Sequence, residues 1–248
     1  MMRASDWVPR IFSATLIAIG AYGLISVQFV AFWVPLVPAP PQWKWIIGTV
    51  TLLGGLGLLQ RKAGFFAAPA LLAILVIWLA RFKAPAIFAA PLTAGSWESA
   101  AETVAIAAGL LCFLKSSHAA LVARLLLGLA MCAFGAAHFA YLAQTAALVP
   151  QWLPAHVLLV YLTGAVFAVS GIGLILGMAA RGFAILVAIQ MGFFTVLVWL
   201  PRILAGIHDV STVSECLDSA ALAAVAAVVA RNIGRGSSAG ASSISASP

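Results

Sequence analysis

Long apolar runs, broken by single charged residues or by proline-rich turns, dominate the sequence. Residues 11–43 and 125–180 contain no Asp, Glu, Lys or Arg. A helix needs about 20 apolar residues to cross a hydrocarbon core of ~30 Å, so the second run is long enough for two passes. Pro150 and Pro154 divide that run, because proline interrupts a helix interior and favours a turn.

The apolar runs predict eight helices with short connections between them. Residues 84–95 are apolar but too few to span a membrane, and we expect an interfacial or re-entrant loop there. The period-2 alternation of a membrane β-strand is missing. The expected fold class is therefore all-α, a polytopic integral membrane protein with about eight transmembrane helices. The predicted helices cover residues 11–33, 42–60, 64–81, 98–114, 122–146, 154–178, 182–200 and 214–230.

Composition narrows the function classes. Apolar residues make up 64% of the chain and charged residues 8%, and the mean hydropathy is +1.13. Soluble domains carry about 25% charged residues, so this chain has too little polar surface for a water-facing globule. The net charge of +7 comes from basic residues that lie singly between apolar runs. No basic cluster is present to follow a phosphate backbone, and we expect no nucleic-acid partner.

The chain carries no recognisable cofactor or metal motif. Cys112, Cys132 and Cys216 form no CxxC, CxxCH or zinc-like spacing. No pair of ligands has His-x-x-x-His spacing, so we expect no metal site. Haem, flavin and iron–sulfur motifs are also missing, and a redox function would need an additional subunit to carry the cofactor.

The distribution of basic residues predicts the orientation of the chain. The lipid bilayer is the expected environment, and a bacterial inner membrane the expected location. Loops rich in Lys and Arg remain in the cytoplasm, and the more basic side includes both ends of the chain. We therefore expect both termini in the cytoplasm, with residues 1–10 as a short N-terminal segment and 232–248 as a disordered tail. The more basic side carries Arg3, Arg10, Arg61, Lys62, Lys115, Arg124, Arg181, Arg231 and Arg235, and the other side Lys44, Arg81, Lys83 and Arg202.

Most tryptophans fall near the predicted outer helix ends. This placement is typical of an aromatic belt at the membrane interface, and a ring-stacking ligand site is the alternative. These tryptophans are Trp33, Trp43, Trp45, Trp78, Trp97, Trp152 and Trp199.

The two halves of the chain are related by an internal repeat. A shift of 116 residues pairs Tyr22 with His138, Gly48 with Gly164, and Gly55 with Gly171. The repeats would cover residues 11–115 and 120–231 as two four-helix bundles. Four helices per half is an even number, so both repeats should have the same orientation, related by an axis along the membrane normal.

His138 is the most conspicuous polar residue within an apolar helix. It lies about 21 Å beyond Arg124 at a rise of 1.5 Å per residue, in the outer third of the membrane. Tyr141 follows at i+3, on the same predicted face. One interpretation is a structural hydrogen bond between helices. The other is a proton or ligand site, in which the imidazole bonds a quinone carbonyl or passes a proton.

Two pairs of acids open the fourth and eighth predicted helices. A structural interpretation is that they complement the helix dipole, with Ser96 as an N-cap and Thr212-x-x-Glu215 as a capping box. The functional interpretation is an outer vestibule, shared with His138, that relays protons or binds a cation. The four acids are Glu98, Glu102, Glu215 and Asp218.

Several motifs in the second half resemble the DoxX-like family of four-helix membrane proteins. They are Gly135-Ala-Ala-His138-Phe139, Val149-Pro150-x-x-Leu153-Pro154, Tyr161-x-x-Gly164, Gly171-Ile-Gly173-Leu174 and the basic Arg181. The likeness spans about 124–230, and the repeat extends it to a fused tandem of two DoxX-like units. Members commonly carry an acid three residues after the glycine that Gly164 matches. This chain has Phe167 there and Thr51 at the repeat position, which puts in doubt any role resting on that acid.

The resemblance implies an accessory role beside a quinone-linked redox system, because the family includes a thiosulfate:quinone oxidoreductase subunit. We expect no catalytic activity of the chain alone. His138 would face a lipophilic ligand, such as a quinone, and a membrane or periplasmic redox protein would be the partner. The alternatives are a small transporter or permease, and a membrane scaffold or assembly protein without a ligand. A transporter should have polar groups at the membrane middle, whereas the titratable groups here cluster outwards.

Overall fold

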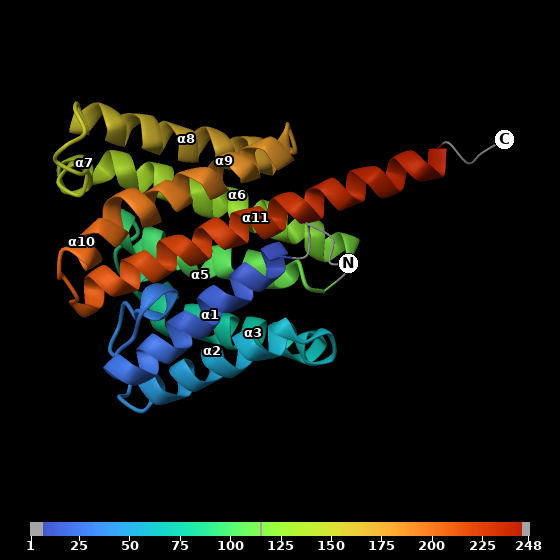
Figure 1. Ribbon diagram of the computed structural model, residues 1–248, viewed down its shortest axis with the longest axis horizontal. Helices are drawn as coiled ribbons and strands as arrows, with labels where there is room; N and C mark the ends of the chain where they lie inside the picture. Colours follow the sequence, from blue (N-terminus) through green and yellow to red (C-terminus); the bar gives the residue numbers. More distant parts are fainter. Residues whose placement is uncertain (1–6, 115, 245–248) are drawn as a thin grey trace.

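The computed structural model describes residues 7–114 and 116–244, and within them the secondary structure is entirely helical (Figure 1). The all-α prediction is confirmed for this part of the chain. The segment η2 is a 3₁₀ turn, and η3 and η4 are π-helical turns. The elements are α1 (Trp7–Ser26), η2 (Ala31–Trp33), α2 (Trp43–Leu59), α3 (Arg61–Trp78), η3 (Leu79–Lys83), α4 (Ala84–Ala89), α5 (Ala94–Leu111), α6 (Ser117–Ala140), α7 (Leu142–Ala146), α8 (His156–Leu176), α9 (Ala180–Phe193), η4 (Phe194–Trp199), α10 (Leu200–Leu204) and α11 (Val210–Ile244).

Six helices of the described residues are long and apolar enough to cross a membrane, which indicates an integral membrane protein. The apolar helix α2, over Trp43–Leu59, is shorter than these six. The helix α5 is not among the six either, so a total of eight spans stays a prediction. The six are Trp7–Ser26, Lys62–Ala89, Ser117–Ala140, His156–Leu176, Ala180–Leu204 and Val210–Gly234.

The first helix is shorter than predicted. It ends at Ser26, whereas the apolar pattern predicted a helix to residue 33. Val27 takes a left-handed backbone conformation, with φ of 52°, and the N–H of Gln28 donates to the carbonyl of Gly23 at 3.3 Å. This bond pattern closes a helix C-terminus. Hydrophobicity alone could not reveal it, because glycine is the usual residue at such a position.

Residues 84–89 form helix α4, which corrects the loop predicted for 84–95. The chain runs from α3 through η3 into α4 and turns at residues 90–93. In η3 the N–H of Ala84 donates to the carbonyl of Leu79, five residues earlier, just before Pro85. In η4 the N–H of Leu200 donates to Thr195 in the same way, just before Pro201. The wider turn accommodates a proline, which has no N–H to continue the α-helical pattern.

The helix α11 is longer than predicted. It continues to Ile244, through residues for which we expected a disordered tail. Once a helix is formed, each added residue contributes another backbone hydrogen bond at little cost, so propagation beyond the packed part is physically reasonable. Residues 1–6, Lys115 and 245–248, on which parts of the predicted termini and loop fall, lie outside the described residues.

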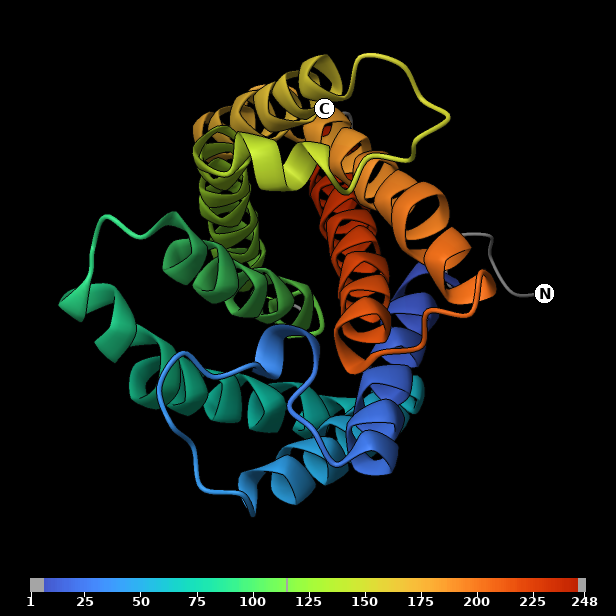
Figure 2. The same ribbon diagram turned by 90° about the vertical axis from the view of Figure 1, so that its left-hand side faces the viewer.

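The helices form a ring, with α1, α2 and α3 on one side of it and α6, α8 and α9 on the other (Figure 2). In the first half α1 packs on α2, and in the second half α6 packs on α8. Glycine permits both close approaches. A Cβ added at Gly55 would lie 2.8 Å from Ile17 of α1, and one added at Gly171 would lie 2.6 Å from Cys132 of α6. The halves meet where α5 packs on α6 and α11, and where α1 packs on α11.

Aromatic side chains fill the interior of the first half. Trp33 and Trp78 are each only 1% exposed, so they do not belong to a belt at the molecular surface. Their rings meet edge to face at 5.6 Å, and Trp78 lies 4.3 Å from Phe82. The segment η2 brings Trp33 inward and lies within the ring of helices in Figure 2. This filled interior matters because the second half encloses a cavity instead.

Candidate functional site

A cavity of about 350 Å³ lies in the second half. Its walls come from α6, α8, α9, η4 and α11, from the loop after α7, and from α5 of the first half. The volume is at the lower end of the range for small-molecule pockets. Most of the lining is apolar, and acidic side chains come from α5 and α11. The lining residues are Glu98, Glu102, Phe134, His138, Thr145, Leu148, Val149, Pro150, Leu153, Leu159, Val160, Thr163, Phe167, Met191, Phe193, Phe194, Leu197, Val198, Trp199, Glu215, Asp218, Ser219 and Leu222.

His138 lines this cavity from the last turn of α6 and is 8% exposed. Its ring stacks on Phe194 at 6.0 Å and meets Phe167 edge to face at 5.1 Å. Its Nδ1 lies 2.9 Å from the carbonyl oxygen of Phe134, one turn earlier. The aromatic contacts and the backbone bond together fix the plane of the imidazole. The expectation that His138 is turned toward the interior agrees with this position.

The hydrogen bond of His138 defines its tautomer. A carbonyl oxygen only accepts, so Nδ1 carries the hydrogen and donates it to Phe134. In the neutral ring, Nε2 then bears a lone pair and is an acceptor. No described residue forms a hydrogen bond with Nε2.

The four predicted acids converge on the same cavity. Glu98 and Glu102 come from α5, and Glu215 and Asp218 come from α11, which packs against α5. Asp218 is 4% exposed, and its Oδ1 has no hydrogen-bond partner among the described residues. The charge of Glu102 interacts with the charges of Lys83, Glu98, Glu215 and Asp218.

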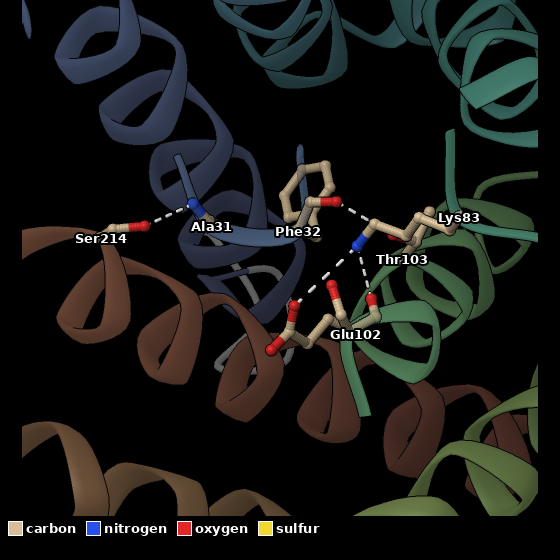
Figure 3. Close-up of polar contacts among 7 residues, drawn as sticks. Ala31, Phe32, Lys83, Glu102, Thr103 and Ser214 are labelled. Carbon is tan, nitrogen blue, oxygen red and sulfur yellow. Dashed lines mark hydrogen bonds and ion pairs between the residues drawn. The ribbon is translucent and has the colours of Figure 1, made fainter. Parts of the chain in front are cut away.

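Lys83 is a member of this cluster that sequence reasoning missed. We placed it in an outer loop, but its side chain is fully buried. Its ammonium donates to the carbonyl of Ser99 at 2.5 Å and lies 4.0 Å from Oε2 of Glu102. Figure 3 shows Lys83 beside Glu102. The available signal was its position within residues 63–97, an apolar run with only one other charged residue, Arg81. An ionisable residue inside such a run needs a partner.

The segment η2 ties the two acid-bearing helices together. The N–H of Ala31 donates to Oγ of Ser214 in α11 at 2.6 Å, and Oγ1 of Thr103 in α5 donates to the carbonyl of Phe32 at 2.9 Å (Figure 3). Bonds to both helices from one short segment fix the spacing of α5 and α11. The geometry of the acids therefore depends on a loop of the first half.

Tyr141 does not line the cavity, unlike the other five predicted site residues. The helix α6 ends at Ala140, and Tyr141 itself is not helical, so the predicted shared face with His138 is interrupted. Its hydroxyl oxygen accepts from the N–H of Gly95 at 3.0 Å. Tyr141 thus joins the end of α6 to the first turn of α5.

The predicted caps are displaced. The helix α5 begins at Ala94 after Thr93, so Ser96 is not its N-cap. At α11, Asp209 accepts from the N–H of Thr212 at 2.9 Å and from its hydroxyl at 2.7 Å. These bonds hold the pKa of the exposed Asp209 carboxyl below its ordinary value of 3.8. Asp209 therefore caps the helix, and Glu215 is left to face the cavity.

Within the described residues, no group of three His, Cys, Asp or Glu side chains is placed to hold a metal ion. The three cysteines are all free thiols. The cavity combines hydrogen-bonding and charged side chains with apolar surface.

The described residues form an all-helical protein with the character of an integral membrane protein, and they surround a mainly apolar cavity with acidic side chains on one wall. No protein-family model, curated protein or solved structure matches the chain. The likeness to the DoxX-like family rests on the sequence motifs and stays a prediction.

Proposed function

We propose that the chain is a DoxX-like integral membrane protein that binds a lipophilic, quinone-type ligand in the cavity of its second half. It would act as an accessory subunit of a quinone-linked redox system. The observation that carries this proposal is the cavity itself, which combines apolar walls with His138 and four carboxylates. A quinone-type molecule likewise combines an apolar tail with a ring that carries polar substituents.

The proposal includes one ligand site rather than two. The segments after α1 and α6 occupy equivalent positions in the repeat, yet they differ in packing. Ala31, Phe32 and Trp33 are buried in the first half, whereas Leu148 and Val149 border the open cavity of the second. Tyr22 replaces His138 at the repeat position in the first half. Both differences favour ligand binding in the second half.

An accessory role follows from the chemistry of the chain. The sequence has no motif for a haem, flavin or iron–sulfur cluster, so electrons would have to come from a partner protein. The partner would be a redox protein of the membrane or of the periplasm. In this proposal the chain binds and positions the quinone, and its partner carries out electron transfer.

The same proposal includes the topology of the chain. It has eight spans, two parallel repeats and cytoplasmic termini in a bacterial inner membrane. The glycine contacts of α1 with α2 and of α6 with α8 support the repeat, as do the π turns before Pro85 and Pro201. The start of α1 and the later part of α11 lie toward the same end of the molecule (Figure 1). An even number of spans requires that arrangement.

A transporter or permease is the alternative that a specific observation favours. Lys83, Glu102 and Asp218 form a largely buried charged cluster where the two halves meet. Transporters place such groups at the interface between repeats. A proton or a small cation would be the substrate in that case.

Quinone content after purification tests the main proposal. The full chain is extracted from membranes in a mild detergent, and quinone is quantified per protein molecule. We expect near-stoichiometric quinone with the natural chain and little with Val160→Phe, which fills the cavity from α8. Val169→Phe, on an exposed position of the same helix, is the matched control and should retain quinone. Equal quinone in both variants would contradict the site, and no quinone in any of them would favour the transporter or a scaffold without a ligand.

A further inference from the structure

We propose that the cavity selects the hydrogen-bond-donating form of its ligand, so that it binds a quinol, with two hydroxyl groups, more tightly than the corresponding quinone. This inference rests on the proposed function and adds the form of the ligand that the site prefers. It comes from the hydrogen-bonding capacity of the groups around the cavity. Sequence reasoning suggested the opposite role for His138, as a donor to a quinone carbonyl.

His138 is the first acceptor. Its Nδ1 hydrogen is already donated to the Phe134 carbonyl at 2.9 Å, so the neutral ring offers only the lone pair of Nε2. A quinone carbonyl is also an acceptor and would meet that lone pair without a hydrogen bond. A quinol hydroxyl can donate to it. A 180° flip of the ring would place Cδ2 against the Phe134 carbonyl and lose this hydrogen bond, so the observed orientation is favoured.

Asp218 is the second acceptor. Its Oδ1 is buried without a hydrogen-bond partner among the described residues, and the side chain lines the cavity. An ionised carboxylate only accepts hydrogen bonds, whereas a protonated carboxyl also donates one. In the described part of the chain, four neighbouring acids beside the single cation Lys83 do not all ionise together, so we assign the acceptor role to the unpartnered Oδ1 of Asp218 alone. The nearest cation, Lys83, does not line the cavity and already donates to Ser99.

Two of the three hydroxyl groups on the lining already donate within the protein. The hydroxyl hydrogens of Thr145 and Thr163 are donated to the carbonyls of Tyr141 and Leu159. Ser219, which can donate or accept, and the indole N–H of Trp199 remain on the lining. The two polar atoms of the lining that carry the inference, Nε2 of His138 and Oδ1 of Asp218, are therefore acceptors without a partner among the described residues. A site built of buried acceptors rejects a ligand that lacks the matching donor, because its own polar groups are then left unpaired.

Three probes of nearly equal shape test this selectivity on the full chain in lipid nanodiscs. They are a short-chain quinol kept reduced without oxygen, the corresponding quinone, and the dimethyl ether of the quinol, which has no donor. We expect the quinol to bind at least ~tenfold more tightly than either of the others, the ratio that one unsatisfied polar group produces. A quinone that binds as tightly as the quinol would overturn the inference and leave the proposed function intact. Failure of all three probes to bind would contradict the proposed function itself.

Two substitutions locate the selectivity. His138→Gln supplies an amide that both donates and accepts, and Asp218→Asn adds a donor at the unpartnered carboxylate. Each should bring the quinol-to-quinone affinity ratio toward unity mainly by strengthening quinone binding. If His138→Gln does not fold, Asp218→Asn alone still tests the selectivity. His156→Gln, at the start of α8 and away from the cavity lining, should keep the natural ratio. An unchanged ratio in the folded His138 and Asp218 variants would overturn the assignment.

Discussion

His138 is held between Phe167 and Phe194 and by a single backbone hydrogen bond, so its side chain contributes both packing and polar stabilisation. An imidazole buried at this depth has no bulk water to satisfy its nitrogens. The structure supplies a partner for Nδ1, and the cavity gives Nε2 access to a ligand. The structural role and the proposed ligand-binding role therefore belong to different nitrogens of the same ring.

Substitution separates these two roles. His138→Ala should lower the free energy of unfolding by about 1–3 kcal/mol, because it removes one hydrogen bond and the aromatic contacts. His138→Gln should recover much of that loss, since its amide can still bond the Phe134 carbonyl. Thermal unfolding in detergent measures both changes. If the Gln variant also retains full quinol selectivity, His138 is a structural residue and the ligand role is wrong.

Lys83 is the second residue whose surroundings decide its role. Lys83→Met should destabilise the protein by about 1–3 kcal/mol, because it leaves the partly buried carboxylate of Glu102 without its cation. Adding Glu102→Gln to that variant should restore part of the loss, and the double-mutant cycle gives the coupling between the two groups. Lys62→Met, at an exposed position, is the control. If Lys83→Met lowers the free energy of unfolding no more than Lys62→Met does, the ion pair does not contribute to stability.

The helix pairs α1 with α2 and α6 with α8 depend on glycine at their closest contacts. A Cβ added at Gly171 would lie 2.7 Å from the carbonyl oxygen of Gly128, and backbone cannot move aside easily. Gly171→Ala should therefore destabilise the protein by about 1–3 kcal/mol. Gly192→Ala, in α9, meets nothing within 4 Å and should be neutral or stabilising by up to ~1 kcal/mol. Equal stability of the two variants would contradict the close packing of α6 on α8.

The start of α11 gives a prediction about pH. Hydrogen bonds from Thr212 lower the pKa of Asp209 in the folded protein, so the ionised form contributes stability above the ordinary aspartate value of 3.8. That contribution is lost as the pH falls through the folded pKa. Asp209→Ala should therefore be less stable than the natural chain at neutral pH, and the difference should shrink in strong acid. A pH-independent difference in unfolding temperature would show that the cap does not depend on charge.

Apolar runs predict the bounds of a helix well where the number of apolar residues sets its length. They predict these bounds poorly where the backbone conformation of single residues ends or bends the helix. The helix α8 follows the predicted span of residues 154–178 closely, because uninterrupted apolar residues set its length. The helix α9 ends at Phe193, and the rest of the predicted span 182–200 is the π-helical turn η4 and the start of α10. The end of α1 was predicted seven residues too late, because Val27 adopts a conformation that its own residue type disfavours. The loop predicted for 84–95 became a helix, because a π turn accommodates Pro85.

At the scale of the whole molecule, the sequence singled out His138 and the four acids and predicted a shared outer vestibule, but not the packing that forms it. Their common cavity requires α5 of the first half to pack against the second half. Lys83 was assigned to a loop because basic residues near helix ends usually are. Its burial depends on contacts with Ser99 and Glu102, which no periodicity reveals. The filled first half likewise follows from the inward path of η2.

Ligand binding by the second half is the central claim, and its most direct measurement is the equilibrium affinity of a short-chain quinol for the full chain in lipid nanodiscs. The account predicts saturable binding with one site per chain. Val160→Phe should weaken that binding at least ~tenfold, a loss of about 1.4 kcal/mol, whereas Val169→Phe should leave it unchanged. Binding that is absent, or that is equal in the two folded variants, would contradict the account.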